Sequence, residues 1–135
     1  MKNLTVPAST LKLDDVLDFI NAELESHDFP IKVQMQIAIA VEEVFVNIAN
    51  YAYSPSEGDV MVCCGIENDP LAVTIQFIDS GKPYDPLLKS DPDTTLSAEE
   101  RDIGGLGIFM VKKSMDHIHY EYKNQKNILT IKKKG

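Results

Sequence analysis

Hydrophobic residues over positions 31–53 recur at helical spacing and form two apolar stripes. The first follows i, i+4, i+7, i+11 and i+15 and comprises Ile37, Val41, Val44, Ile48 and Ala52. The second comprises Met35, Ile39, Val46, Ala49 and Tyr53. No glycine or proline interrupts the segment, so the pattern predicts one long helix. A helix that is apolar on two faces is normally buried between two layers, and we expect this here.

Shorter patterns precede this helix. Residues 4–8 predict a short edge strand whose pairing ends at Pro7, because proline has no N–H to donate. Either Ser9 or Thr10 can then cap a helix through its side-chain oxygen. Apolar residues continue at helical spacing after the cap, which predicts a helix that ends near Glu25.

The second half of the chain predicts two pairs of strands. Residues 60–66 and 73–77 alternate between the two faces of a strand and are separated by a short turn. Residues 118–122 and 128–131 form a second such pair, and we interpret the three lysines that follow as a solvated tail. A helix over 106–115 precedes this pair.

The order of these elements predicts the fold class. Strands joined by short turns pair in antiparallel fashion, so we expect an α+β, two-layer sandwich and no doubly wound sheet. The sheet should be mostly antiparallel, with helices on one face. The chain has 135 residues, which is enough for one domain over 1–135. The long polar segment from Asp79 to Gly105 is typical of a lid or binding loop.

Composition and charge narrow the range of partners. The net charge is −8 and the pI is about 4.7, which argues against a nucleic-acid partner. No apolar run reaches the ~20 residues that span a bilayer, and the N-terminus lacks the apolar core of a signal peptide. We therefore expect a cytoplasmic protein with no membrane contact. Cys63 and Cys64 are adjacent, and we interpret them as reduced strand residues.

Polar residues interrupt the long helix where its stripes predict burial. Glu43 and Asn47 lie four positions apart on one face, with Cβ atoms roughly 5–6 Å from each other. A buried acid and amide side by side indicate a site, since such groups need partners or a polar cavity. The alternative is that Glu42 and Glu43 lie at a solvated rim and that Asn47 caps a neighbouring turn.

Two further clusters carry candidate chemistry. Asp79 ends a strand and Gly81 follows it, in an Asp-Ser-Gly-Lys-Pro-Tyr-Asp-Pro segment that could equally be a turn. Gly104, Gly105 and Gly107 open the last predicted helix, where bare N–H groups and the helix dipole favour a phosphate. Packing alone is the alternative. The cluster is neither a Walker A loop nor a Rossmann fingerprint, because the required lysine and βαβ unit are absent.

The three clusters in this order resemble the histidine-kinase-like ATPase superfamily. The similarity extends over nearly the whole chain and is closest to the anti-sigma-factor serine/threonine kinases. It implies the Bergerat ATP-binding fold, ATP and Mg²⁺ as cofactors, and one domain. It also implies a homodimer that binds a sigma factor or, alternatively, a small antagonist protein that it phosphorylates.

The resemblance also implies residue roles. Asn47 would hold the Mg²⁺ ion on the triphosphate, and Glu43, not Glu42, would accept the proton of the substrate hydroxyl. Asp79 would accept a hydrogen bond from the adenine amino group, with Gly81 giving access. The remaining ATP-binding residues would be Tyr84, Gly104, Gly105, Leu106 and Gly107. Residues 85–104 would form a lid that orders when nucleotide binds.

The chain departs from the family at two places. The family often has His-Ala-Tyr after the first cluster, where this chain has Tyr51-Ala52-Tyr53. The superfamily often has Gly-Thr at the start of the last strand, where this chain has Lys126-Asn127. We expect nucleotide binding with reduced affinity for adenine.

Three other functions remain open on sequence grounds. The protein could hold ATP without phosphorylating anything and sequester a partner, although Glu43 favours a kinase. It could be a phosphotransfer component of another relay, although its histidines are not placed for that. It could bind no ligand at all.

Overall fold

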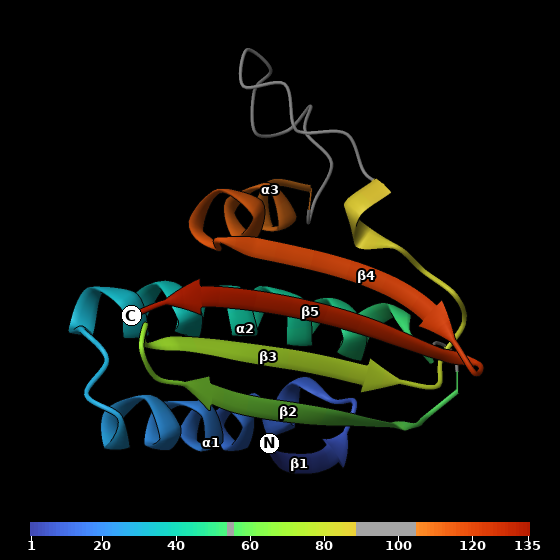
Figure 1. The fold of residues 1–135 in the computed structure, drawn as a ribbon. Helices are drawn as coiled ribbons and strands as arrows, with labels where there is room; N and C mark the ends of the chain where they lie inside the picture. The colour runs from blue at the N-terminus through green and yellow to red at the C-terminus, as the bar shows by residue number, and fades with distance from the viewer. Residues whose placement is uncertain (54–55, 89–104) are drawn as a thin grey trace.

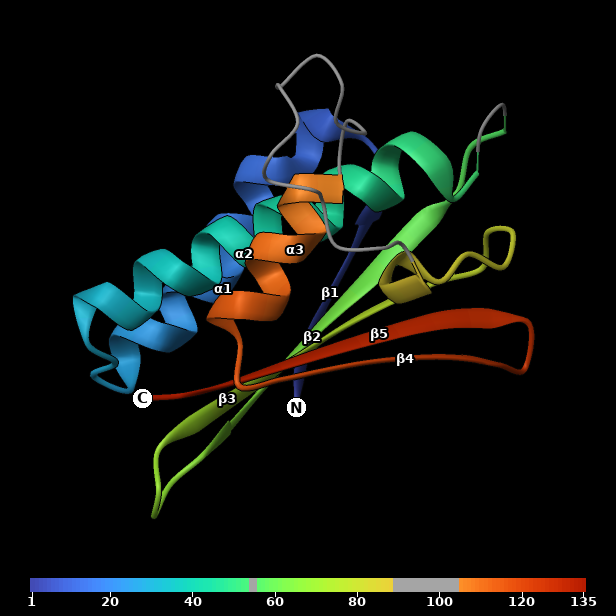
Figure 2. The same cartoon turned by 90° about the horizontal axis from the view of Figure 1, so that it is seen from above.

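The computed structural model describes residues 1–53, 56–88 and 105–135. A sheet forms one layer, and helices cover one of its faces (Figures 1 and 2). The strands are β1 (Lys2–Pro7), β2 (Asp59–Glu67), β3 (Ala72–Asp79), β4 (His117–Lys123) and β5 (Lys126–Lys134). The α-helices of the described chain are α1 (Leu13–Ser26), α2 (Ile31–Tyr51) and α3 (Gly105–Ser114). Short 3₁₀ helices are η1 (Thr10–Lys12) and η2 (Pro86–Leu88).

The strand order is β1-β2-β3-β5-β4, and each of these neighbouring pairs is antiparallel. A tight turn joins β4 to β5, where Asn124 and Gln125 adopt positive φ angles of 54° and 62°. The predicted α+β sandwich is therefore confirmed. The register places Asp79, the last residue of β3, opposite Asn127 on β5.

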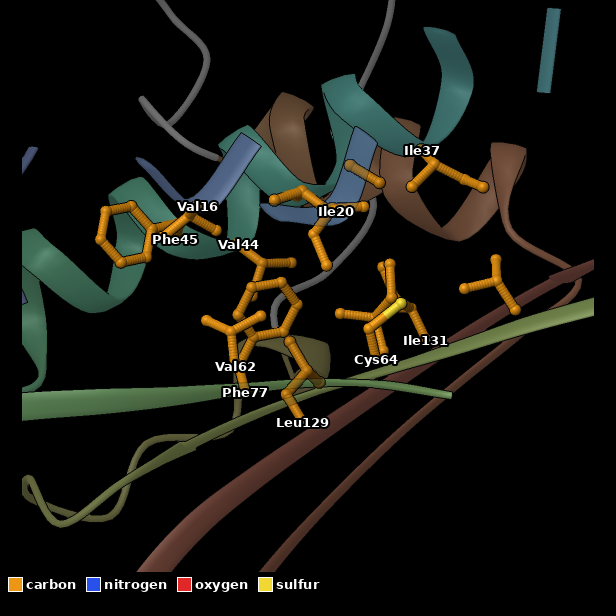
Figure 3. Packing of buried hydrophobic residues seen from close by; sticks show 14 of the residues in the cluster. Val16, Ile20, Ile37, Val44, Phe45, Val62, Cys64, Phe77, Leu129 and Ile131 are labelled. Atoms are coloured by element: carbon orange, nitrogen blue, oxygen red, sulfur yellow. The ribbon is translucent and has the colours of Figure 1, made fainter. Parts of the chain in front are cut away.

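The core lies between the helices and the sheet (Figure 3). Alternate residues of the central strands point toward the helices, because successive side chains in a strand face opposite sides. Phe45 of α2 and Phe77 of β3 are fully buried in this layer. Cys64 of β2 is buried and reduced, as is its neighbour Cys63, which confirms the prediction for both.

The second apolar stripe of α2 is not buried as expected. Met35 and Ile39 are 61% and 57% exposed, whereas Ile37 and Val41 on the first stripe are fully buried. The physical reason is that α2 has the sheet on one side only, with α1 and α3 packed beside it (Figure 2). The prediction of burial between two layers was wrong.

Two boundaries also differ from the predictions. Ser9 caps η1, its Oγ accepting from the Leu11 N–H at 3.2 Å, and α1 begins only at Leu13. Lys132–Lys134 form the end of β5 and pair with β3, so they are not a solvated tail. Sheet pairing continues there because β3 supplies backbone partners as far as Ala72. No helix among the described residues is long and apolar enough to cross a membrane.

Candidate functional site

A pocket opens between the C-terminal half of α2, the end of β3 and the β4–β5 edge of the sheet. Its walls are mainly apolar, with Ile48, Phe77 and Leu129 among the lining residues. Three predicted site residues, Asn47, Asp79 and Tyr84, also line it. An apolar pocket with a few convergent polar groups is the usual form of a small-molecule site.

Asp79 provides a buried carboxylate in this pocket and is only 5% exposed. Its Oδ1 accepts from the Gly81 N–H at 2.9 Å and from Asn127 Nδ2 at 2.9 Å. Within the described residues no donor contacts Oδ2. Because buried carboxylate oxygens normally accept hydrogen bonds, Oδ2 suits a ligand that brings an N–H donor.

The turn after Asp79 is hydrogen-bonded to the residues that directly follow α2. The Lys82 N–H donates to the Ala52 carbonyl at 3.0 Å, and the Ser80 N–H donates to the Tyr53 hydroxyl at 2.8 Å. Gly81 is needed for this approach, since a Cβ there would lie 2.6 Å from the Ala52 carbonyl carbon. The contact brings the strand end and the α2 polar face to one pocket.

Glu43 lies one helical turn before Asn47, against the start of α3. A Cβ added at Gly107 would lie 2.5 Å from Glu43 Cδ and would overlap Oε2. The Glu43 carboxylate therefore packs directly against the Gly107 Cα. Glu43 is partly buried and Glu42 is exposed, which places only Glu42 at the solvated rim. The Glu43 carboxylate is thus held near the pocket by the packing of α2 on α3.

The other predicted residues are placed as follows. Tyr84 lines the pocket, with its ring 6.3 Å from that of Tyr51. Gly105 is the first residue of α3, so the helix N-terminus lies at the predicted phosphate cluster. Leu106 follows it in α3. Gly104 lies outside the described residues, as does most of the predicted lid.

Several residues of the pocket wall were not predicted as site residues, and Lys82, Tyr120 and Asn127 are polar members of that set. Asn127 was noted only as a departure, but the strand register opposite Asp79 was the signal that could have identified it. Tyr120 lies two residues after Ile118 in β4, and both pack against the core, so the period of a strand could have placed Tyr120 on the inner face. Burial raises the pKa of Tyr120, so its hydroxyl stays protonated to a higher pH than that of an exposed tyrosine.

Comparison with known proteins decides the family. The sequence profile of the histidine kinase-like ATPase domain matches residues 6–133. The chain belongs to the histidine kinase-like ATPase family. The family assignment confirms the resemblance and, with it, an ATP-binding domain. The chain is also similar to the serine/threonine-protein kinase BtrW of Bordetella bronchiseptica. The two are 21% identical over 100 residues, which cover 74% of this chain and 70% of that protein.

The described part of the chain offers no ready-made cluster of ionisable side chains for a metal ion. Among the described residues, no group of three or more His, Cys, Asp or Glu side chains could hold a metal ion. The predicted Mg²⁺ site requires only one protein ligand, the amide oxygen of Asn47, since magnesium readily keeps water and takes phosphate oxygens. Asn47 in the pocket wall fits that requirement.

Proposed function

We propose that this protein is an ATP-dependent serine/threonine-protein kinase that acts as an anti-sigma factor. The observation that carries the proposal is the position of Glu43, one turn from the pocket residue Asn47 and against Gly107 at the start of α3. A carboxylate there is useful for proton transfer. A domain that only bound nucleotide would not need it.

Each group has a role in the proposed reaction. The substrate hydroxyl oxygen forms a bond to the γ-phosphorus of ATP while the bond from phosphorus to the β–γ bridging oxygen breaks. Glu43 accepts the hydroxyl proton, and ADP leaves. The N–H groups at the start of α3 bind phosphate oxygens, and Asp79 binds the base. Positioning and charge neutralisation supply most of the catalysis in phosphoryl transfer.

Asn47 would hold Mg²⁺ together with the phosphate oxygens of ATP. When bound, the ion neutralises phosphate charge. The Asn47 amide, which lines the pocket from the α2 side, would hold the ion there. Nucleotide affinity should therefore depend on magnesium through Asn47.

The proposed protein partners are a sigma factor and a small antagonist whose serine or threonine is phosphorylated. Support comes from the family resemblance of the motifs and from the net charge of −8, which suits a basic protein surface. We also propose a cytoplasmic homodimer. Met35 and Ile39 offer an exposed apolar surface on α2 for protein contact.

Phosphoryl transfer tests the proposal. The protein is incubated with radiolabelled ATP, magnesium and the candidate antagonists encoded by neighbouring genes. We expect label on the antagonist with the unmutated protein and loss of ~10²–10⁴ in rate with Glu43→Gln. Glu42→Gln, an exposed neighbour, is the matched control and should retain transfer. If the unmutated protein binds ATP and partner but transfers nothing, the inactive binding module is the better account.

A further inference from the structure

A pair of histidines lies on the edge strand of the sheet, outside the pocket. His117 and His119 are two positions apart in β4, so their side chains point to the same face of the strand. Ile118 and Tyr120 pack against the core, so the histidines lie on the face that the helices leave uncovered (Figure 2). Both histidines are exposed. In the described sheet β4 comes last in the strand order, so no further strand lies beside the pair.

The two imidazole rings face each other, and their nitrogens have no protein partner. The ring centres are 6.3 Å apart, and the ring planes are 16° from parallel. Within the described residues, neither ring takes part in a hydrogen bond or an ion pair. His27 differs, because its Nδ1 donates to the Glu23 carbonyl oxygen at 3.0 Å. A neutral imidazole whose ring nitrogen is not hydrogen-bonded is available as a metal ligand.

The spacing of the rings suits chelation of one ion by both. An imidazole nitrogen lies about 2.0–2.1 Å from zinc, so two such rings in a tetrahedral arrangement have centres about 5 Å apart. The rings of His117 and His119 would have to approach by about 1 Å to reach this separation. Rotation of the side chains can supply that movement, because both rings are exposed and the χ2 torsion of histidine is broad.

The charges around the pair favour a cation. Lys132 lies opposite His117 on β5. The Lys132 Nζ donates to Glu67 Oε1 on β2 at 3.4 Å, which directs its charge across β3 and away from β4. Glu121 lies on the same face of β4, two positions beyond the pair, and brings a negative charge. The net charge of the chain, −8, also attracts cations.

We propose that His117 and His119 form a site for a divalent transition metal ion, such as Zn²⁺, Ni²⁺ or Cu²⁺. The two imidazoles are the protein ligands, and water completes the coordination. Imidazole suits these ions, whereas Mg²⁺ prefers oxygen ligands, so the site is distinct from the proposed Mg²⁺ position at Asn47. Two protein ligands are fewer than the three or four of catalytic and structural zinc sites, so the ion exchanges readily.

Calorimetry with zinc chloride tests the site, with excess magnesium chloride present. We expect His117→Ala and His119→Ala each to bind zinc about 100-fold more weakly than the unmutated protein, because each removes the gain from linking two ligands. His27→Ala is the matched control, since it removes the third histidine of the chain, and it should bind zinc as the unmutated protein does. Circular dichroism checks that each variant is folded. No zinc binding by the unmutated protein, or the same affinity in all three variants, would overturn the proposal.

Paramagnetic Ni²⁺ identifies the ligands without any substitution. The chain has three histidines, so the three variants are enough to assign their imidazole C–H signals in an NMR spectrum. We expect less than one equivalent of Ni²⁺ to broaden the signals of His117 and His119 together while that of His27 stays sharp. Broadening of His27 at the same nickel concentration, or of one member of the pair alone, would contradict chelation.

Discussion

The contact between Gly107 and Glu43 makes Gly107→Ala a sharp test of the proposed base. The added methyl group brings no charge and no hydrogen-bonding atom to the site, so its effect is steric. Its carbon would lie 2.5 Å from Glu43 Cδ and would overlap Oε2. Non-bonded carbons normally stay about 3.5–4.0 Å apart, so the carboxylate must move by about 1 Å.

We expect Gly107→Ala to lower the rate of phosphoryl transfer rather than the stability of the fold. Glu43 is a flexible side chain, and alanine favours the helix by ~1 kcal/mol over glycine, so α3 should remain folded. A displacement of 1 Å in a reacting group can cost about 10²-fold in rate. We therefore expect phosphoryl transfer to the antagonist to fall about 100-fold, with the unfolding midpoint unchanged or raised.

Single-turnover transfer of labelled phosphate, measured beside chemical denaturation, checks this expectation. Gly107→Ala combined with Glu43→Gln should be no slower than Glu43→Gln alone, because both changes act through one carboxylate. Transfer at the unmutated rate by Gly107→Ala would refute the reasoning. A double variant that transfers phosphate much more slowly than Glu43→Gln alone would also refute it.

Three other outcomes are expected. Asn47→Ala should weaken ATP binding in the presence of magnesium and have much less effect without it, as calorimetry with and without chelator would show. Phe45→Ala removes a fully buried ring and should lower the free energy of unfolding by ~3–5 kcal/mol in urea titrations. Burial raises the pKa of Cys64 to about 11, so the unfolded chain releases that proton at lower pH than the folded one. Stability should therefore fall between about pH 8.5 and 11 in denaturation curves, and less so in Cys64→Ala.

The elements could be predicted because local patterns determine them. Alternation in 60–66 and 73–77 reflects strands with one buried face, and both lie within β2 and β3. The exposure of Met35 and Ile39 could not be predicted. Periodicity reveals an apolar face but not whether a second layer covers it, since that depends on how many elements pack on the helix.

The site could be predicted as a set of residues but not as a geometry. Motif order pointed to Asn47 and Asp79, which line one pocket. The contact of Glu43 with Gly107 depends on how α2 packs against α3, and no local pattern contains that information. The hydrogen bond from Asn127 to Asp79 could not be predicted for a related reason: it joins residues that are 48 positions apart in the sequence.

Binding of ATP at Asp79 tests the central claim most directly. Calorimetry with ATP and magnesium should show binding to the unmutated protein. Asp79→Asn, which replaces an acceptor-only carboxylate with an amide, should weaken it about 10- to 100-fold while circular dichroism shows the same fold. No ATP binding by the unmutated protein, or equal affinity in Asp79→Asn, would contradict the account.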